Sequence, residues 1–353
     1  MKHVTIQGLR RYLLLFLAVL AVSLAFCGRP LRAEGTVSDT EAETETDAET
    51  DAEPETGADA ETGAEPETET DAEPETGAEE ELTWSGGKLL CIRDGKRVRD
   101  EWVDVGTSRY YFSKNGTAAV GLFKNLNRWY VSDRAGRLAR GQDIKIVTVE
   151  GKRYFADSKG HPVSGWKLYN GNLYYARGEE GGFAVVTDDT ADRISFDAWG
   201  HAVESNNRNL KIKTMEIIAS ITDDSMDNAA KLRAAWNYVC SSRFSYFGNY
   251  PDMNDPNWPR VLAYQFFTQG GGNCYGFACS FSALAHEIGY NPVVVHGLCP
   301  GSRDHRADGL TRHCCLSING AYYDPEGQYA GWAQGIYGTG GSSLVAINGT
   351  LEF

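Results

Sequence analysis

The sequence predicts an α+β protein in which a mixed C-terminal domain follows an all-β repeat region and a disordered acidic linker. An aromatic motif closed by glycine recurs about every 20 residues from residue 83. This period stops near residue 206, and apolar residues at helical spacing follow from residue 225. The expected segments are a signal peptide at 1–33, the linker at 34–82, β-hairpin repeats at 83–205 and the C-terminal domain at 206–353.

The first 33 residues have the charge order of a signal peptide. Three basic residues precede the apolar run 12–27, and small residues allow cleavage after Ala25 or Ala33. The run is short for a membrane span. We therefore expect a secreted protein, and an uncleaved N-terminal anchor is the alternative.

Residues 34–82 consist almost entirely of Glu, Asp, Thr, Ala, Gly and Pro, and 21 of them are acidic. Without aromatic residues the segment has nothing to bury, and like charges extend it, so it predicts a disordered spacer. This linker accounts for the net charge of −14, because residues 83–353 are nearly neutral. No basic stripe indicates nucleic-acid binding.

The repeat region contains six related stretches: KLLCIRDG, YYFSKNG, WYVSDRAG, RYFADSKG, YYARGEEG and ISFDAWG. Their last glycines are Gly95, Gly116, Gly136, Gly160, Gly181 and Gly200. Each unit predicts a strand, a polar turn closed by glycine and a second strand. Stacked hairpins can bury their aromatic residues against each other, so a solenoid-like array is expected.

The clearest unit, GHPVSGWKLYNGNLYYA, contains the dipeptide Gly165-Trp166. This unit resembles the cell-wall-binding repeats of choline-binding and glucan-binding proteins. The resemblance implies that aromatic residues bind choline, as on teichoic acid, or a wall polysaccharide. The candidates are Trp129, Tyr130, Tyr154, Trp166, Tyr174 and Tyr175. The alternative is a spacer or docking scaffold in which these residues form the core.

The C-terminal domain begins with helical patterns. Residues 225–239 have helical spacing with Ser225 as the expected N-cap, and a short helix is expected near 261–267. In QGGGNCYGFACSFSALAHEIGYNPVVVHG, a helical face follows Cys274, Gly289 ends the helix and a buried strand follows at 293–295. Cys274 is thus expected at a helix N-terminus, where the helix dipole favours a nucleophilic thiolate.

The stretch RHCCLSINGAYYDPE supplies a base and a carboxylate. Asn319-Gly320 predicts a two-residue hairpin turn, which pairs residue 318 with 321 and residue 316 with 323. His313 and Asp324 then lie on the same face as diagonal neighbours. A carboxylate in that position can hold an imidazole in one tautomer, so the residues predict a nucleophile–base–acid triad.

These two stretches resemble the transglutaminase-like superfamily over roughly residues 220–330. The resemblance implies a papain-like core with Cys274 as the nucleophile, His313 as the general base and acid, and Asp324 as the orienting residue. It implies either protein crosslinking or hydrolysis of peptide or amide bonds through a thioester. The oxyanion candidates are the Cys274 backbone N–H and the Gln269 side chain.

Other residues near the expected site received separate interpretations. His305 lies in a polar loop, GSRDHRADG, that could border the site, and Glu326 would face His313 if the hairpin continued past Pro325. Seven cysteines remain after the predicted cleavage, and their disulfide connectivity cannot be assigned from the sequence. A metal site is not expected, because the cysteines near His313 lack zinc-type spacing.

The sequence therefore predicts a secreted, bacterial cell-wall-associated cysteine enzyme that acts on a protein or peptide and requires no cofactor. Its repeats are expected to bind cell-wall polysaccharide or teichoic acid. The alternative is a non-catalytic binding protein in which the C-terminal fold recognises wall material or peptides without acyl transfer.

Overall fold

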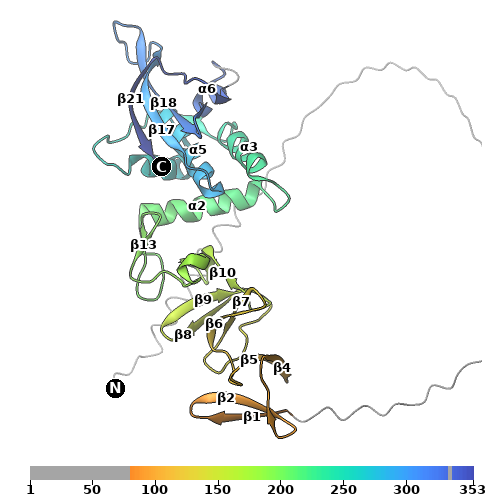
Figure 1. The fold of residues 1–353 in the computed structure, drawn as a ribbon. Helices are drawn as coiled ribbons and strands as arrows, with labels where there is room; N and C mark the ends of the chain where they lie inside the picture. Colours follow the sequence, from red (N-terminus) through yellow and green to blue (C-terminus); the bar gives the residue numbers. More distant parts are fainter. Residues whose placement is uncertain (1–79, 333–335) are drawn as a thin grey trace, which may run out of the picture. The chain divides into compact units, whose positions relative to one another are not determined.

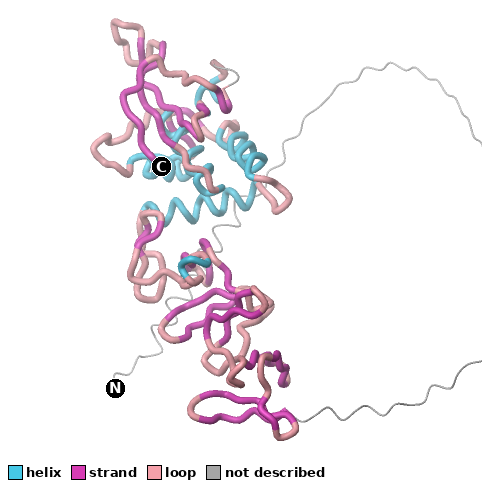
Figure 2. The backbone as a smooth tube through the Cα atoms, in the orientation of Figure 1, coloured by secondary structure: helices cyan, strands magenta, loops and turns pink. Residues whose placement is uncertain are grey.

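The computed structural model describes residues 80–332 and 336–353, all within one compact unit. The predicted signal peptide and most of the predicted linker lie outside the described residues. Among the described residues, no helix is both long and apolar enough to cross a membrane. Figure 2 shows that strands dominate up to residue 205 and that the long helices all follow it.

The repeat region is a series of antiparallel two-strand hairpins (Figure 1). The paired strands are β1 (Glu80–Ser85) with β2 (Lys88–Arg93), β4 (Glu101–Val105) with β5 (Ser108–Phe112), β6 (Gly121–Asn125) with β7 (Arg128–Ser132), β8 (Lys145–Val149) with β9 (Lys152–Ala156), β11 (Gly165–Tyr169) with β12 (Asn172–Ala176), and β13 (Thr190–Ala191) with β14 (Ile194–Ser195). Shorter elements are β3 (Lys96–Arg97), β10 (Pro162–Val163) and the 3-10 helix η1 (Glu179–Gly181).

The predicted strand–turn–strand unit is confirmed at Gly95, where β3 pairs with β2, and at Gly160, where β10 pairs with β9. The longer hairpins have a different turn, and in the β6–β7 hairpin it is Leu126–Asn127, with positive φ angles of 45° and 63°. The glycine-closed turn instead follows the second strand: Gly136 has a φ of 78°, and Asp133 Oδ1 accepts the N–H groups of Ala135 and Arg137. Such Asx-type turns carry the chain from one hairpin to the next.

One recurrent glycine departs from this pattern. Gly181 ends η1, and the left-handed residue there is its neighbour Gly182, with a φ of 63°. The RGEEG stretch places two glutamates in a single 3-10 turn, so the left-handed position moves one residue along the chain.

Neighbouring hairpins bury aromatic residues against each other, as the repeat pattern predicted. Phe155 on β9 is fully buried and meets Tyr174 on β12 edge to face, with ring centroids 5.4 Å apart. Between other units, Val131 and Val149 pack in one cluster with Tyr154. Each hairpin therefore depends on its neighbours for a core, as a two-strand hairpin cannot bury enough apolar surface alone.

The first hairpin begins earlier than the sequence indicated. β1 starts at Glu80, three residues before residue 83, where the repeats were expected to begin. Leu82 pairs with Cys91 and packs against the first core cluster, and Arg93 Nε donates to Glu80 Oε1 over 3.1 Å. These contacts extend the strand into residues that composition alone assigns to the spacer.

The C-terminal domain is an α+β unit in which α5 packs on a five-stranded antiparallel sheet (Figure 1). The sheet order is β20-β19-β18-β17-β21. The strands of this sheet are β17 (Val293–Pro300), β18 (Leu310–Ile318), β19 (Ala321–Tyr323), β20 (Tyr337–Thr339) and β21 (Ala346–Glu352). A separate parallel pair is formed by β15 (Ser245–Tyr246) and β16 (Gly271–Gly272). The helices are α2 (Asn206–Ile221), α3 (Asn228–Val239), α4 (Trp258–Gln269), α5 (Cys274–Ile288) and α6 (Pro325–Ala330).

Two helix boundaries correct the sequence analysis. The N-cap of α3 is Asp227, whose side chain accepts the N–H of Ala230 over 2.7 Å, whereas Ser225 bonds Asp223 in the preceding turn. A carboxylate at this position satisfies the free N–H groups and complements the helix dipole. The sequence analysis did not expect α2, which begins directly after its N-cap Ser205.

The core of the C-terminal domain surrounds α5, whose residues 274–285 are all buried. α2, α3 and α4 cover α5 on the sides that the sheet leaves open. Trp236 on α3 meets Phe281 on α5 edge to face, with ring centroids 5.3 Å apart. The first turn of α5 is thus fixed by packing on several sides.

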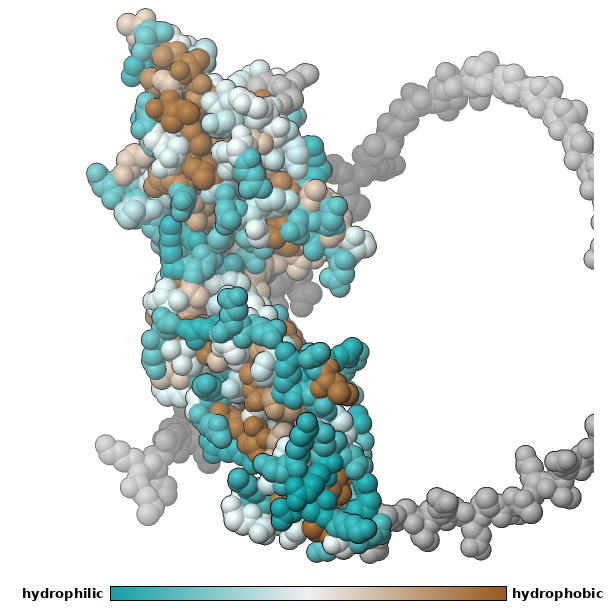
Figure 3. Space-filling model, viewed as in Figure 1, coloured by the Kyte–Doolittle hydropathy of each residue, from teal (hydrophilic) through white to brown (hydrophobic). Residues whose placement is uncertain are grey.

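In Figure 3, apolar side chains gather on the surface over β17 and β21, where Ile347 is exposed.

Candidate active site

Cys274 is the first residue of α5, as predicted, and is held there by backbone geometry. The Asn273 side chain caps the helix by accepting the N–H groups of Tyr275 and Gly276. Just before it, Gly271 has a φ of 147° and pairs with Ser245, and a Cβ at Gly271 would lie 1.9 Å from the Ser245 carbonyl oxygen. The glycines before the cysteine therefore allow a close strand contact that directs the chain into the helix.

His313 and Asp324 come from β18 and from the residue that follows β19. The Asn319–Gly320 turn has both φ angles positive, and the predicted pairs of 318 with 321 and 316 with 323 are confirmed. His313 Nε2 lies 2.6 Å from Asp324 Oδ2, and both side chains are almost fully buried. The hairpin register thus places the Asp324 carboxylate beside Nε2 of the His313 ring. The second ring nitrogen, Nδ1, is not bonded to Asp324.

Three donors surround the Asp324 carboxylate. Besides His313, the Ser343 hydroxyl donates to Oδ2 over 2.5 Å and the Gly327 N–H donates to Oδ1 over 3.0 Å. Burial by itself would raise the pKa of Asp324, but the bonds from His313, Ser343 and Gly327 lower it below 3.8. The carboxylate is therefore ionised at neutral pH and can orient the imidazole.

The same environment raises the pKa of His313. Burial alone would lower it, but hydrogen bonds with Asp324 and Cys274 and the negative charges of both groups raise it well above 6.5. The three residues predicted from the sequence are thus brought together as a Cys–His–Asp arrangement.

A loop residue that the sequence analysis did not name reaches the sulfur. Arg303 Nη1 lies 3.9 Å from Cys274 Sγ, and its guanidinium stacks on Tyr246 at 4.9 Å from the ring centroid. Cys274 has no exposed surface, whereas the Arg303 side chain is 38 % exposed. Arg303 lies in the polar loop expected to border the site, and His305 from that loop is exposed. The loop contributes a cation next to the candidate nucleophile.

Gln269, the side-chain candidate for the oxyanion hole, is exposed at the C-terminal end of α4. The structure does not bring it into contact with the three candidate residues within the part of the chain that it describes. The Cys274 backbone N–H lies at the helix N-terminus and fits the expected role. Ser343 was not anticipated either, because it lies 19 residues after Asp324 with no local pattern between them.

A cavity of about 400 Å³ opens beside His313. Its lining includes Cys299, Arg303, Thr311, His313, Glu326 and Trp332. The Trp332 ring meets the imidazole edge to face, with centroids 5.4 Å apart. The cavity is large enough for a small organic group or a side chain. It combines apolar walls with two groups of opposite charge type, Arg303 and Glu326.

The cysteines of the described residues are all free. Cys314 and Cys315 are both buried after His313, with Cys314 packed in the core that surrounds α5. Burial raises the pKa of Cys279, Cys314 and Cys315, which disfavours their thiolates. Among the buried thiols, Cys274 is distinguished by its contacts with an imidazole and a guanidinium.

His313, Asp324 and Glu326 form the cluster among the described residues whose ligand atoms converge closely enough for a metal ion. All three are buried, but Asp324 already accepts bonds on both oxygens. A metal ion would have to break the His313–Asp324 bond to coordinate both residues. The donor set therefore fits the hydrogen-bonded arrangement better than a metal centre.

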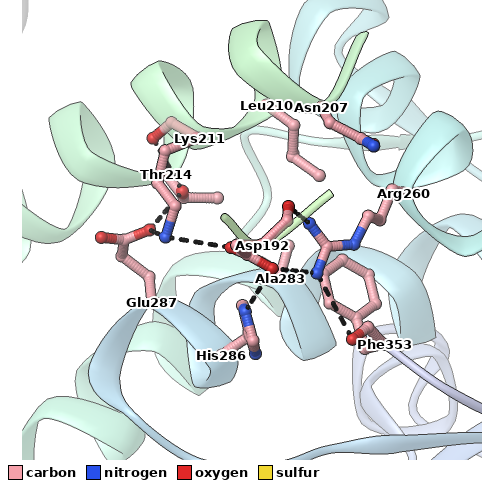
Figure 4. Close-up of a pocket in the computed structure, with 10 residues that line it drawn as sticks. All are labelled: Asp192, Asn207, Leu210, Lys211, Thr214, Arg260, Ala283, His286, Glu287 and Phe353. Carbon is pink, nitrogen blue, oxygen red and sulfur yellow. Dashed lines mark hydrogen bonds and ion pairs between the residues drawn. The ribbon is translucent and has the colours of Figure 1, made fainter. Parts of the chain in front are cut away.

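Figure 4 shows a second polar cluster, away from Cys274, around Asp192 of the β13–β14 hairpin. Asp192 accepts bonds from Arg260 over 2.5 Å and pairs with His286 over 3.1 Å and with Lys211 over 3.5 Å. A cavity of about 10 Å³ lies within the cluster, and a larger one of about 280 Å³ borders it and is also lined by Trp166 and Tyr175. The ion pairs of the cluster join the last hairpin to α2, α4 and α5.

The predicted wall-binding aromatic residues differ in burial, and Trp129, Tyr130, Trp166 and Tyr175 are half-buried. Tyr154 and Tyr174 are buried in the cores of the repeats. Trp166 is half-buried, and the Lys211 ammonium lies 4.7 Å from its ring centroid. Trp129 borders a shallow groove of about 300 Å³ together with Arg128, His161, Pro162 and Phe183. Of the predicted candidates, Trp129 is therefore the one that lines a cavity in the repeats themselves.

Residues 216–333 match the model of the Transglutaminase-like superfamily. The C-terminal part of the chain is thus a transglutaminase-like domain, as the resemblance in the sequence predicted. This match covers the helix that begins at Cys274, together with His313 and Asp324. No curated protein matches the chain.

Solved structures of choline-binding proteins match the repeat region. CbpJ from Streptococcus pneumoniae TIGR4 is 27 % identical over 35 % of this chain and 40 % of its own, with a TM-score of 0.26. CbpF from Streptococcus pneumoniae in complex with ipratropium is 25 % identical over 35 % and 38 %, with a TM-score of 0.26. A pneumococcal cell wall endolysin from phage Cp-1 is 23 % identical over 39 % and 40 %, with a TM-score of 0.30. The matched part spans about two fifths of those chains.

Proposed function

We propose that this protein is a secreted, cell-wall-associated cysteine acyl-transfer enzyme. Cys274 attacks a carboxamide or peptide carbonyl, His313 passes the proton to the leaving amine, and a thioester forms on the sulfur. Water or an amine then resolves the thioester and restores the thiol. The observation that carries the proposal is the buried bond of 2.6 Å between His313 Nε2 and Asp324 Oδ2, together with the hydrogen bond between the imidazole and Cys274.

The surroundings of Cys274 support this chemistry. Cys274 is the first residue of α5, so the positive end of the helix dipole and the Cys274 backbone N–H lie beside the position where a tetrahedral intermediate would place its oxyanion. Arg303 adds a cation at 3.9 Å from the sulfur. Both features stabilise negative charge, first on the thiolate and then on the oxyanion.

The location at the wall rests on the repeats and on the predicted signal peptide. In the groove beside Trp129, the Phe183 ring lies edge to face at 6.0 Å and the Trp129 Nε1–H donates to Glu179 over 2.8 Å. An indole held in this way can stack on a sugar or face a quaternary ammonium group. Lys124 already lies 5.2 Å from the indole centroid, so a choline group would have to displace it.

Selective alkylation of Cys274 in the full-length chain tests the proposed enzyme. Iodoacetamide is applied from pH 5 to 8, and the modified cysteine is identified by mass spectrometry in the wild type, His313→Ala and His305→Ala. We expect rapid labelling of Cys274 at low pH that is lost in His313→Ala and kept in His305→Ala, an exposed histidine of the neighbouring loop. Labelling of Cys274 no faster than that of the other thiols would favour a non-catalytic binding protein.

A further inference from the structure

Arg303 is a cation beside Cys274 that lacks a close carboxylate partner. Among the described residues, the carboxylate oxygen closest to it is Glu326 Oε1, which lies 4.0 Å from Nη2 and is too far away for a hydrogen bond. Burial also raises the pKa of Glu326, which disfavours its charged form. The guanidinium therefore keeps N–H donors free for an anion that the chain itself does not supply.

The acidic residues of the same loop are bonded to other arginines. Asp304 accepts a bond from Arg312 over 2.9 Å, and Asp308 accepts one from Arg306 over 2.6 Å. Both of these ion pairs are complete without Arg303. The loop thus leaves a single guanidinium, that of Arg303, at the candidate site without a hydrogen-bonded carboxylate.

The guanidinium of Arg303 is held in place at the edge of a cavity. It stacks on Tyr246 at 4.9 Å from the ring centroid, with Nη1 on the side of Cys274 and Nη2 on the side of Glu326. The same residue lines the cavity of about 400 Å³ that opens beside His313. A stacked guanidinium presents its N–H donors in one plane, which is the geometry that binds a carboxylate through two hydrogen bonds.

The position of Arg303 limits where such a carboxylate lies in a substrate. Its Nη1 atom is 3.9 Å from Cys274 Sγ, and a carbonyl carbon poised for attack lies about 3–3.5 Å from the nucleophile. A carboxylate on Arg303 is therefore only a few covalent bonds away from the reacting carbonyl. Two groups of a peptide have this spacing: the α-carboxylate of a C-terminal residue whose amide bond is attacked, and the side chain of an aspartate that supplies the carbonyl.

We propose that Arg303 binds a carboxylate of the substrate next to the carbonyl that Cys274 attacks, so that the site selects acidic peptides. The inference rests on the proposed function, because it names the substrate class of the same site. The carboxylate takes no part in the bond changes and positions the carbonyl over the sulfur. The apolar walls that Pro300 and Trp332 give the cavity accommodate the carbon chain beside it.

The test measures the charge preference at Cys274 without depending on turnover. Iodoacetate and iodoacetamide alkylate thiols by the same reaction, and iodoacetate carries a carboxylate where iodoacetamide carries an amide. The ratio of their rates at Cys274, divided by the ratio for glutathione, therefore reports an anion site beside the sulfur. The full-length wild type is compared with Arg303→Gln, Arg303→Lys and the matched control Arg306→Gln, an exposed arginine of the same loop.

We expect Cys274 to favour iodoacetate more than glutathione does. In Arg303→Gln this preference should fall roughly fivefold, less than for a fully buried charged hydrogen bond because solvent partly screens the guanidinium. Arg303→Lys should keep most of the preference and Arg306→Gln all of it. Taking the ratio removes any effect of Arg303 on the reactivity of the sulfur itself. A preference no greater than that of glutathione, or one that Arg303→Gln leaves intact, overturns the inference.

Protection of Cys274 from iodoacetamide identifies the source of the carboxylate. N-acetylglycine carries it on the amine side of an amide, and N-acetylaspartic acid α-amide carries it on the acyl side, with N-acetylglycinamide and N-acetylasparagine α-amide as the neutral controls. We expect at least one acid to protect Cys274 better than its neutral control, and Arg303→Gln to abolish the difference. Equal protection by each acid and its neutral control overturns the inference.

Acylation is measured separately, by release of p-nitrophenol from p-nitrophenyl acetate with Cys274→Ser as the background. This neutral ester has no carboxylate for Arg303, so its acylation of Cys274 tests the proposed enzyme alone. No release above the background overturns the proposed function, even where the alkylation ratio reveals an anion site. Release above the background without a preference for iodoacetate keeps the enzyme and overturns the acidic substrate.

Discussion

Ser343 donates a hydrogen bond to the same oxygen of Asp324 that binds His313, so one carboxylate oxygen receives two donors from different segments of the domain. Ser343 lies in the loop before β21, whereas His313 lies on β18. The bond restrains the carboxylate that orients the imidazole. This places Ser343 as a positioning residue behind the Cys–His–Asp arrangement.

Removing the Ser343 hydroxyl should shift the acidic side of the pH profile of Cys274 alkylation. Ser343 helps to lower the pKa of Asp324, so in Ser343→Ala this pKa rises and the carboxylate loses its charge at a higher pH. We expect the pH below which alkylation of Cys274 fails to shift upward, with a small effect at neutral pH. Ser342→Ala changes the neighbouring hydroxyl, which contacts Leu344 instead, and should leave the profile in place.

Asp324→Asn should cost far more activity than Ser343→Ala. An amide keeps the size of the side chain but can turn its N–H₂ towards the imidazole and select the wrong tautomer. By analogy with serine hydrolases we expect a loss of roughly 10³–10⁴ in the acylation rate. p-Nitrophenol release measures this rate, and near-normal release in Asp324→Asn would remove Asp324 from the proposed mechanism.

The Asp192 cluster should control acid stability. Burial by itself would raise the pKa of Asp192, but the bonds from His286 and Arg260 lower it below 3.8. Since the folded-state pKa is the lower one, the stabilisation is fully present above pH 3.8 and is lost as the pH falls through the folded-state value. In urea unfolding at pH 7, Asp192→Asn should lose roughly 3 kcal/mol, and this difference should shrink in acid.

Asp188→Asn is the control for this prediction. Asp188 lies just before β13, four residues from Asp192, but it is exposed and outside the charge cluster. Its φ of 49° suits asparagine as well as aspartate. We expect the free energy of unfolding of Asp188→Asn to match the wild type. A loss in Asp188→Asn equal to that in Asp192→Asn would contradict the assigned role of the cluster.

The glycine before Cys274 should be intolerant of any side chain. In Gly271→Ala the new Cβ would lie 1.9 Å from the Ser245 carbonyl oxygen at a φ of 147°, so β15 and β16 must separate. We expect a lower melting temperature and slower alkylation of Cys274, because α5 begins just after this contact. Gly248→Ala, where no atom lies within 4 Å of the added Cβ, should change neither measurement.

The local pattern of the sequence was enough to place the three candidate residues. The helix that begins at Cys274 follows from apolar spacing and its Gly289 stop, and the Asn319–Gly320 turn fixes the register of His313 and Asp324. These features depend on neighbours within a dozen residues, so sequence reasoning reaches them. The repeats were also recognised from their period, although the turn of the longer hairpins, such as β6–β7, was not, because a glycine-closed Asx turn resembles a hairpin turn in sequence.

Only the tertiary structure decided which distant groups complete the site. Arg303 and Ser343 reach Cys274 and Asp324 from loops. Their positions depend on how the β17–β18 loop and the segment before β21 fold back over the sheet. No periodicity or spacing encodes such contacts, because they arise from packing between segments that are far apart in the chain. The sequence by itself determined the nucleophile, its base and its carboxylate, while the fold determined the charges and the cavity around them.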